Sequence, residues 1–485
     1  MAASSSLLSS LAFLIALFCF RVAGQDQTIH DVGCIHLPIV HSTNVGHFSS
    51  KRGVQLALAN RSDVAYYAQL SIGTPPQPVY VQLDTGSFEL WVNPDCSTVS
   101  GGDAVFCDRA GRYDTAKSST FNNIGTTKTL RYGIGSADIT YVTDTITLTG
   151  STMGLKGVQF GVANATEDAF SGILGIGYGQ GIATRYPNFI DQLAAQNATK
   201  VKAYTLALGS KDEQEGVIVF GGIDTSKFAG PLAKLPVIPA DMSPDMVPRF
   251  WVDMKSISVT PPNKNNQVYA NSSIPVFLDS GSTMTLLPPN LTAAIAKDFG
   301  VNAPDANGFF RLDCALTKVN GTLDFAFDGV TVRVPYKELI REVPSTPPAC
   351  FLGITPSSSF ALLGDTFLRS AYVVFDLENH AIWMTQAANC GSTPAALTNL
   401  SSLASVTGAC GMTLSAVTNP STSQVSTTSI TSPQSPSSTP PAAEATTATT
   451  GGTQVPASGG GSVRGSVGLI SSLAITSAVV LVHFI

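Results

Sequence analysis

Histidine is scarce in this chain of 485 residues, and its distribution argues against whole classes of enzyme. Of the six histidines, His380 alone lies between residues 48 and 482. Serine and cysteine hydrolases use a histidine as general base, and catalytic zinc sites usually need two or three histidine ligands. The sequence therefore disfavours these mechanisms, and we expect neither a metal nor another cofactor.

Charged side chains are also few, at 12% of the residues compared with roughly 25% in an average soluble domain. The formal net charge is −6, and no run of Lys and Arg exceeds two residues. Proteins that bind nucleic acid usually carry a basic patch, so we expect no nucleic-acid partner. Hydrophobic residues make up 44% of the chain, which is enough for a large core. At about 150 residues per domain, the length suggests roughly three structural units.

The N-terminus has the features of a secretory leader. Residues 7–20 form an apolar run that is too short to span a bilayer comfortably, and small residues follow it. We therefore predict a signal peptide at residues 1–24. Lys51-Arg52 is a dibasic pair near the start of the chain. Cleavage there by a dibasic-processing protease would release residues 25–52 as a pro-segment.

The C-terminus has the features of a GPI-attachment signal. Residues 467–485 are apolar up to the last residue, and a run of small residues precedes them. We predict attachment at Ser458, with residues 461–485 as the signal that is removed. A tail-anchored helix is the alternative, but no basic flank supports it. Residues 391–460 contain one charged residue and abundant Ser, Thr and Pro, which predicts an O-glycosylated stalk at the cell surface.

Sequons and cysteines fit the same secretory route. The candidate glycosylation sites are the seven N-x-S/T sequons at Asn60, Asn164, Asn197, Asn271, Asn290, Asn320 and Asn399. Of the eight cysteines, Cys19 would leave with the signal peptide and Cys34 with the pro-segment. The even number that remains implies disulfides in an oxidising compartment, although six cysteines allow 15 connectivities. Sequence proximity favours the pairs Cys96–Cys107, Cys314–Cys350 and Cys390–Cys410.

The body of the chain is predicted to be mostly β, because short runs of β-branched and aromatic residues alternate with Gly, Pro, Asn and Asp. Two stretches of it are alike, 81–87 (VQLDTGS) and 276–283 (VFLDSGST). Each aspartate is followed by an apolar-apolar-Gly run, which ends at Gly175 or Gly364, 91 and 85 residues further on. These nearly equal offsets predict one β lobe that is used twice.

The two aspartates of these stretches, Asp84 and Asp279, are the candidate catalytic residues. An ionised carboxylate directly after a buried strand is costly unless hydrogen bonds stabilise it, and the neighbouring hydroxyls can donate such bonds. Two such loops across a pseudo-twofold axis would bring the carboxylates together. At about 3 Å and an effective dielectric constant of about 20, the two charges would repel by roughly 5 kcal/mol. The pair would then keep one proton over a wide acidic range, so that one carboxylate activates a water while the other protonates a carbonyl.

With these motifs the chain resembles the pepsin family of aspartic endopeptidases, from about Tyr66 to Gln386. Two D-[TS]-G-S motifs at a separation of 195 residues are very specific for that family. Further matching stretches are 90–92 (LWV), 132–136 (YGIGS), 170–175 (FSGILG), 221–224 (GGID) and 363–369 (LGDTFLR). The resemblance implies a bilobal fold of two pseudo-twofold-related β lobes, at residues 53–225 and 226–390, with the active-site cleft between them.

The resemblance also assigns roles to individual residues. Thr85 and Ser280 would exchange hydrogen bonds beneath the dyad. Ser87 and Ser282 would bind the outer carboxylate oxygens. The other implied supporting, flap and substrate-binding positions are Gly86, Gly281, Trp91, Tyr132, Gly133, Phe170 and Ile173. Tyr132 would close over the substrate from a flap hairpin, with its hydroxyl held by the Trp91 indole.

The architecture of the two ends is similar to that of the yapsin-like, surface-anchored members of the family found in fungi. We expect a monomer that acts on protein or peptide substrates. A catalytically silent surface glycoprotein with a binding or structural role is the alternative. Silent relatives typically lose one Asp or the Gly after it, and both motifs are intact here, which favours the enzyme.

Substrate preference is the most open of these predictions. Glu167 and Asp168 precede the 170–175 stretch, which in this family borders the pocket for the residue before the cut. Two carboxylates there would favour Lys or Arg through charge-assisted hydrogen bonds. If Phe170 and Ile173 dominate the pocket instead, Phe or Leu is expected. Weak selectivity is the third possibility.

Overall fold

The computed structural model describes residues 33–41, 65–93, 96–97, 107–108, 110–133, 135–148, 154–167, 171–213, 215–343 and 345–411. The predicted signal peptide, dibasic site, GPI-attachment site and C-terminal apolar run lie outside these residues. Within them, no helix combines the length and the hydrophobicity needed to cross a membrane.

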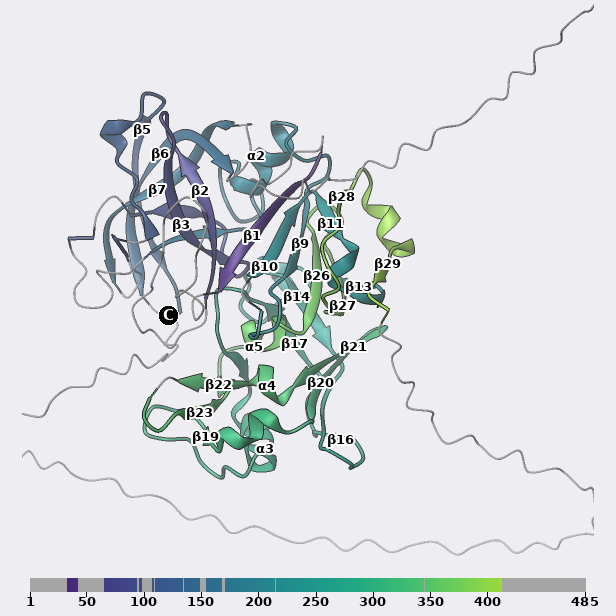
Figure 1. Ribbon diagram of the computed structural model, residues 1–485. Helices are drawn as coiled ribbons and strands as arrows, with labels where there is room; N and C mark the ends of the chain where they lie inside the picture. The colour runs from purple at the N-terminus through teal and green to yellow at the C-terminus, as the bar shows by residue number, and fades with distance from the viewer. Residues whose placement is uncertain are drawn as a thin grey trace, which may run out of the picture. The chain divides into compact units, whose positions relative to one another are not determined.

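Strands dominate the described residues, as Figure 1 shows. In the N-terminal lobe they are β2 (Tyr66–Ile72), β3 (Gln77–Asp84), β4 (Leu90–Val92), β5 (Asn122–Arg131), β6 (Ser136–Leu148), β7 (Gly154–Glu167) and β8 (Gly172–Gly175). In β2 every second side chain from Tyr66 to Ile72 is buried, as expected for a strand with one face on the core. Helix α2 (Phe189–Ala195) begins after Asn188, whose side chain accepts the Asp191 N–H in a capping box.

A central sheet connects the two halves of the chain (Figure 1). Its strands include β9 (Ala203–Ala207), β10 (Glu215–Phe220), β13 (Ala233–Pro236), β26 (Ala371–Asp376) and β27 (Ala381–Gln386). They run in the order β13-β27-β26-β9-β10, and β26 pairs antiparallel with β9. Strands that are far apart in the sequence therefore share one sheet at the junction of the lobes.

The predicted pro-segment supplies one strand of this sheet, β1 (Ile35–His41), which lies between β10 and β2. It pairs antiparallel with β10 over six residues of each strand. Ile35, Leu37 and Ile39 are at most 3% exposed and belong to the main hydrophobic core. Removal of residues 25–52 would therefore expose the edge of β10 and part of this core.

The C-terminal lobe is built from shorter strands and helices. Its strands are β14 (Trp251–Met254), β15 (Ser256–Thr260), β16 (Gln267–Val268), β17 (Ile274–Leu278), β18 (Thr285–Leu287), β19 (Arg311–Leu312), β20 (Thr322–Phe327), β21 (Val330–Pro335), β22 (Ile340–Val343), β23 (Ala349–Leu352), β24 (Ile354–Pro356) and β25 (Leu362–Leu363). Its helices are α3 (Pro289–Asp298), α4 (Tyr336–Leu339) and α5 (Asp365–Leu368). Short 3-10 helices of the two lobes and their junction are η2 (Thr115–Lys117), η3 (Thr225–Lys227), η4 (Ala240–Met242) and η5 (Cys314–Lys318).

Strand pairing shows the same arrangement in both halves. β3 runs parallel to β8, with Asp84 opposite Gly175. β17 runs parallel to β25, with Leu278 opposite Leu363. Each aspartate therefore lies at the end of a central strand, beside the apolar-apolar-Gly run of its own half. This confirms the predicted mostly β fold and the repeated unit.

The predicted boundary of the stalk was wrong, because residues 391–411 fold onto the domain. This extension contains β28 (Pro394–Ala396), η6 (Leu400–Ser405) and β29 (Thr407–Ala409). Its two strands pair with β11 (Gly222–Asp224) and β12 (Ala229–Pro231) of the domain, respectively. Leu397, Leu400 and Leu403 are buried. Their three-residue spacing provides an apolar face. The stalk was predicted from the overall Ser and Thr content, which does not register these three leucines.

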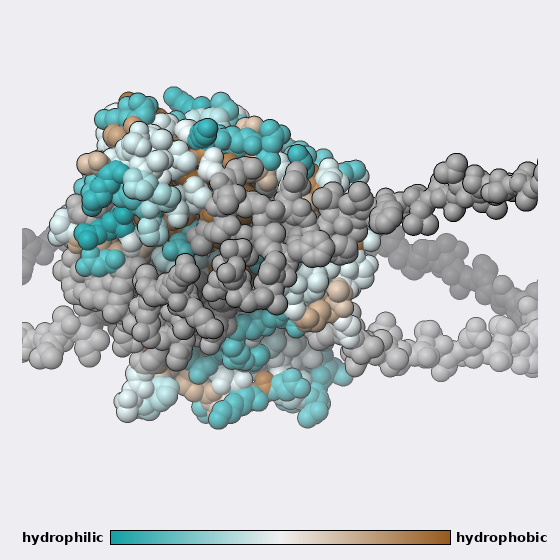
Figure 2. Space-filling model, turned by 45° about the horizontal axis from the view of Figure 1, so that its top comes forward, coloured by the Kyte–Doolittle hydropathy of each residue, from teal (hydrophilic) through white to brown (hydrophobic). Residues whose placement is uncertain are grey.

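The three disulfides are the pairs that sequence proximity favoured: Cys96–Cys107, Cys314–Cys350 and Cys390–Cys410. The third closes the extension onto the end of the C-terminal lobe. Figure 2 shows that hydrophilic residues cover most of the coloured surface on this face, with hydrophobic residues in small separate patches.

Candidate active site

The two predicted catalytic aspartates face each other. Asp84 ends β3 and is 6% exposed, whereas Asp279 follows β17 directly and is half-buried. A Cβ atom on Gly86 would lie 2.5 Å from Asp279 Oδ1. A Cβ atom on Gly281 would lie 2.4 Å from Asp84 Oδ1. Only glycine fits at either position, so each motif provides the space that the carboxylate of the other motif occupies.

The hydroxyl residues after the aspartates join the two lobes. Thr85 Oγ1 donates to the Leu278 carbonyl at 2.9 Å and accepts from the Ser280 N–H at 2.9 Å. Ser280 Oγ donates to the Leu83 carbonyl at 2.9 Å and accepts from the Thr85 N–H at 3.2 Å. Both side chains are fully buried. The predicted exchange of hydrogen bonds beneath the dyad is therefore present.

Backbone amides orient the inner oxygen of each carboxylate. The Gly86 N–H donates to Asp84 Oδ1 at 2.8 Å, and the Gly281 N–H donates to Asp279 Oδ1 at 2.9 Å. Ser87 Oγ donates to Asp84 Oδ2, as predicted. Asp84 therefore accepts two hydrogen bonds from its own motif, one from the glycine amide and one from the serine hydroxyl.

The prediction for Ser282 was wrong. Its hydroxyl donates to the Met284 carbonyl at 3.0 Å instead of to Asp279. A hydroxyl has a single proton, and here that proton closes a local turn two residues further along the chain. The outer oxygens of the two aspartates are consequently not equivalent.

Burial and the neighbouring Asp84 raise the pKa of Asp279 from 3.8 to about 8. Burial disfavours the charged form, and a second carboxylate disfavours it further. The Arg249 guanidinium and the Gly281 N–H act in the opposite direction. The protonated form of Asp279 is therefore favoured at acid pH.

The predicted flap connects β5 to β6, and its Tyr132 is close enough to the dyad to interact electrostatically with Asp84. The Trp91 indole N–H donates to the Tyr132 hydroxyl at 2.7 Å, as predicted. Trp91 and Ile173 belong to one buried cluster, against which Tyr132 packs. Gly133 is half-buried, and Phe170 lies outside the described residues.

Comparison with known proteins agrees with this geometry. Residues 65–387 match the family of eukaryotic aspartyl proteases. The chain belongs to this family. It is 32% identical to the probable aspartic-type endopeptidase opsB of Aspergillus oryzae, over 67% of this chain and 68% of that protein. It is also 32% identical to the aspartic proteinase yapsin-3 of Saccharomyces cerevisiae, over 69% of this chain and 68% of that protein.

A solved structure shows the same fold. The crystal structure of the aspartic proteinase from Irpex lacteus aligns with a TM-score of 0.55 at 21% identity. The alignment covers 73% of this chain and 98% of that one. Together with the family match, this fold identifies the protein as an aspartic-type endopeptidase of the pepsin type.

Glu89 is not among the residues predicted from the sequence, but in this aspartyl protease it connects the flap to the lobe. The carboxylate is 6% exposed and accepts from the Lys128 ammonium on β5. The hydroxyls of Tyr141 and Tyr186 also donate to it, the second at 3.2 Å. Its position two residues after Ser87 is the one feature of the sequence that could have indicated a role near the site. No local pattern identified Lys128 as its partner.

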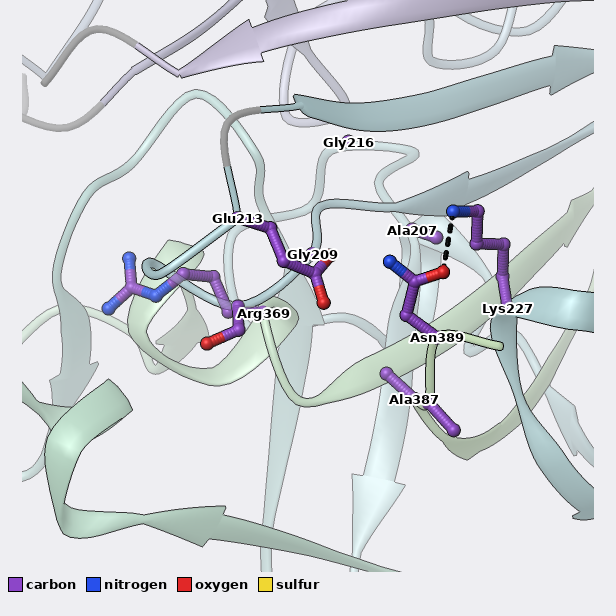
Figure 3. A pocket seen from close by; sticks show the side chains of 10 residues that line it. Ala207, Gly209, Glu213, Gly216, Lys227, Arg369, Ala387 and Asn389 are labelled. Atoms are coloured by element: carbon purple, nitrogen blue, oxygen red, sulfur yellow. Dashed lines mark hydrogen bonds between the residues drawn. The ribbon is translucent and has the colours of Figure 1, made fainter. Parts of the chain in front are cut away.

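A cavity of about 160 Å³ lies apart from the dyad, between the central sheet and the end of the C-terminal lobe (Figure 3). Lys227 Nζ donates to Asn389 Oδ1 at 2.9 Å on one side of it. On the other side the Arg369 guanidinium points away from this pair and binds Glu338. Neither Asp84 nor Asp279 lines this cavity, so it is separate from the candidate active site.

Proposed function

We propose that this aspartyl protease is a secreted, surface-anchored endopeptidase that hydrolyses peptide bonds at acid pH through Asp84 and Asp279. The close approach of Gly86 to Asp279 and of Gly281 to Asp84 carries the proposal. It means that the two carboxylates adjoin each other without an intervening side chain. A peptide carbonyl and one water can then be served by both groups at once.

The two carboxylates would take different roles. Asp84, which accepts hydrogen bonds from the Gly86 N–H and Ser87, is suited to be the ionised base that removes a proton from water. The water oxygen then bonds to the peptide carbon. Asp279, which holds its proton, donates it to the carbonyl oxygen. When the tetrahedral intermediate collapses, the C–N bond breaks and the amine leaves with the proton that Asp84 accepted. One hydroxyl of the intermediate returns its proton to Asp279, so that the carboxylic acid forms and both aspartates regain their starting protonation states.

Cleavage of a peptide library by the purified secreted protein tests this function. We expect hydrolysis of internal bonds at acid pH that a statine-type inhibitor abolishes. Absence of cleavage at every pH, from protein whose N-terminus shows complete processing, would refute the proposal.

Activation is proposed to follow cleavage after Arg52. The dibasic pair precedes β2, where the matched family region begins. N-terminal sequencing should find Gly53 in the mature protein, and Arg52→Ala should retain the pro-segment. A mature protein that begins at Gln25 would contradict this step.

Anchoring is proposed through Ser458 on the sequence of the C-terminus alone. Phosphatidylinositol-specific phospholipase should release the protein from membranes, and a chain that ends before Ser458 should appear in the medium. Recovery of the 467–485 peptide from the mature protein by mass spectrometry would exclude a GPI anchor.

N-glycosylation is proposed at the sequons. The six described sequon asparagines are all exposed, which leaves room for a glycan at each: Asn164, Asn197, Asn271, Asn290, Asn320 and Asn399. Asn60 lies outside the described residues. Mass spectrometry of tryptic peptides before and after endoglycosidase treatment would show which of them are occupied.

Substrate preference is proposed to depend on the end of β7. Glu167 is exposed and pairs with Ser136, the first residue of β6 after the flap tip. Asp168 and Phe170 lie outside the described residues. Paired peptides that differ only by Lys or Phe before the cut distinguish a basic pocket from an apolar one. If Phe is preferred and Glu167→Gln leaves the ratio unchanged, the acidic-pocket hypothesis is wrong.

A further inference from the structure

Arg249 connects the C-terminal lobe to the first catalytic loop. It lies between η4 and β14, and its Nη1 donates to the Gly86 carbonyl, 163 residues away in the sequence. The guanidinium carbon lies 5.1 Å from the centre of the Phe277 ring and 6.0 Å from that of Phe88. Aromatic faces from both lobes therefore flank a permanent positive charge.

Asp245 holds this arginine in place. Arg249 Nε donates to Asp245 Oδ2 at 2.8 Å. Asp245 Oδ1 accepts from the Trp251 indole at 3.0 Å and from the Val247 N–H at 3.1 Å. The two charged side chains are 20% and 16% exposed, so solvent screens them only in part. Since both the carboxylate and the guanidinium are fixed by several hydrogen bonds, the position of the charge is well defined.

The equivalent carbonyl in the other motif has a different partner. Gln82 Nε2 donates to the Gly281 carbonyl at 3.1 Å. The two glycine carbonyls are therefore both bound from the opposite half of the chain. One donor is a neutral amide and the other, Arg249, is a cation. A donor that only holds the glycine carbonyl in position needs no charge, because Gln82 does this with a neutral amide.

We propose that Arg249 is a positioning residue of the dyad that holds the Gly86 carbonyl and, through its charge, displaces the pH range of hydrolysis downward, while Asp245 limits this displacement. The inference rests on the proposed role of Asp84 and Asp279 in catalysis. A cation beside two carboxylates favours their ionised forms. Loss of the cation should raise the pH at which each of the two protons leaves, and loss of its counter-ion should do the reverse.

Other titratable groups also interact with the two carboxylates. These are Asp365 at the start of α5, Tyr132 of the flap and Tyr204 of β9. Burial raises the pKa of each of the three well above its ordinary value. All three are consequently neutral at acid pH. Of the groups named here, only Arg249 and its counter-ion Asp245 carry a charge near the pair.

The test compares three variants of the processed, secreted protein: Arg249→Gln, Arg249→Lys and Asp245→Asn. The readout is the pH profile of kcat/KM on a peptide without ionisable side chains near the cut. Arg249→Gln should move both limbs of the profile to higher pH by about 1 unit. Asp245→Asn should move them to lower pH, and Arg249→Lys should stay near the wild-type profile because it keeps the charge.

Arg249→Gln and Asp245→Asn break the same ion pair but should move the pH profile in opposite directions. This difference separates an effect of charge from an effect of the lost contact. A purely structural role would lower kcat in both variants and move neither limb, or move both in the same direction, and either result would overturn the proposal. If Arg249→Gln fails to fold, an unshifted profile of Asp245→Asn is enough to reject it. If the wild-type protein cleaves nothing, the proposed function fails instead, so the two failures are distinguishable.

Discussion

The two D-[TS]-G-S motifs are nearly identical in sequence, but their surroundings in the structure differ. Ser87 donates to the Asp84 carboxylate, whereas Ser282 donates to the Met284 carbonyl. The Gly86 carbonyl binds a cation and the Gly281 carbonyl binds an amide. Sequence symmetry thus coexists with electrostatic asymmetry. The proposed roles of Asp84 as base and Asp279 as acid require such an asymmetry between two chemically identical side chains.

Loss of either carboxylate should have the largest effect on kcat. The effect should be similar for the two motifs, because the reaction needs both groups. Asp84→Asn and Asp279→Asn should each reduce kcat by roughly 10³-fold or more, because an amide can neither accept the water proton nor supply a proton. Circular dichroism should show an unchanged fold. Asp253→Asn is the matched control, since this exposed aspartate on β14 should leave kcat unchanged. Comparable activity of Asp84→Asn and the wild type would refute the dyad.

The serine pair tests the asymmetry directly. Ser87→Ala removes a hydrogen bond to a charged group, worth about 1.5–3 kcal/mol, so kcat/KM should fall roughly 10- to 150-fold. Ser282→Ala should change kcat/KM by about threefold at most, since its hydroxyl does not touch Asp279. Steady-state kinetics of both variants at one acid pH is the measurement. Equal losses would mean that the two outer oxygens are bound alike after all.

The hydroxyl pair beneath the dyad is the symmetric part of the site, so its two halves should respond equally. Thr85→Val and Ser280→Ala each leave a buried N–H and a buried carbonyl unpaired, which should lower the free energy of unfolding by about 1–3 kcal/mol. Thr85→Ser, which keeps the hydroxyl, is the control. Urea unfolding measures the loss, and the double variant should lose less than the sum of the two single losses. Strongly unequal losses in the free energy of unfolding would show that one of the two hydroxyls contributes most of the stabilisation, and would contradict the symmetry of the pair.

The smallest expected effect is on thermal stability as a function of pH. The pKa of Asp279 is raised from 3.8 to about 8, so its protonated form is favoured in the folded state. This contribution to stability is fully present below about pH 4 and is lost as the pH rises through about 8. Asp279→Asn does not titrate, so its melting temperature should fall by a few degrees less than that of the wild type between pH 4 and pH 8. Parallel melting curves for the two proteins would contradict the raised pKa.

Much of the molecule could be predicted from its sequence, because local patterns of a few residues carried the information. The paired D-[TS]-G-S motifs, the alternation of β strands and the short spacing between cysteines predicted the fold class, the two aspartates and all three disulfides. In each case the physical requirement is local. A carboxylate after a buried strand needs nearby donors, and glycine is needed where backbone and side chain must meet.

Only the tertiary structure decided the remainder. It placed β1 in the central sheet, folded residues 391–411 onto the domain, turned the Ser282 hydroxyl away from Asp279 and brought Arg249 to Gly86. These contacts join residues far apart in the chain, or depend on which of several acceptors lies within reach of one proton. Neither composition nor spacing carries that information, because the partner is selected by the packing of the two lobes against each other.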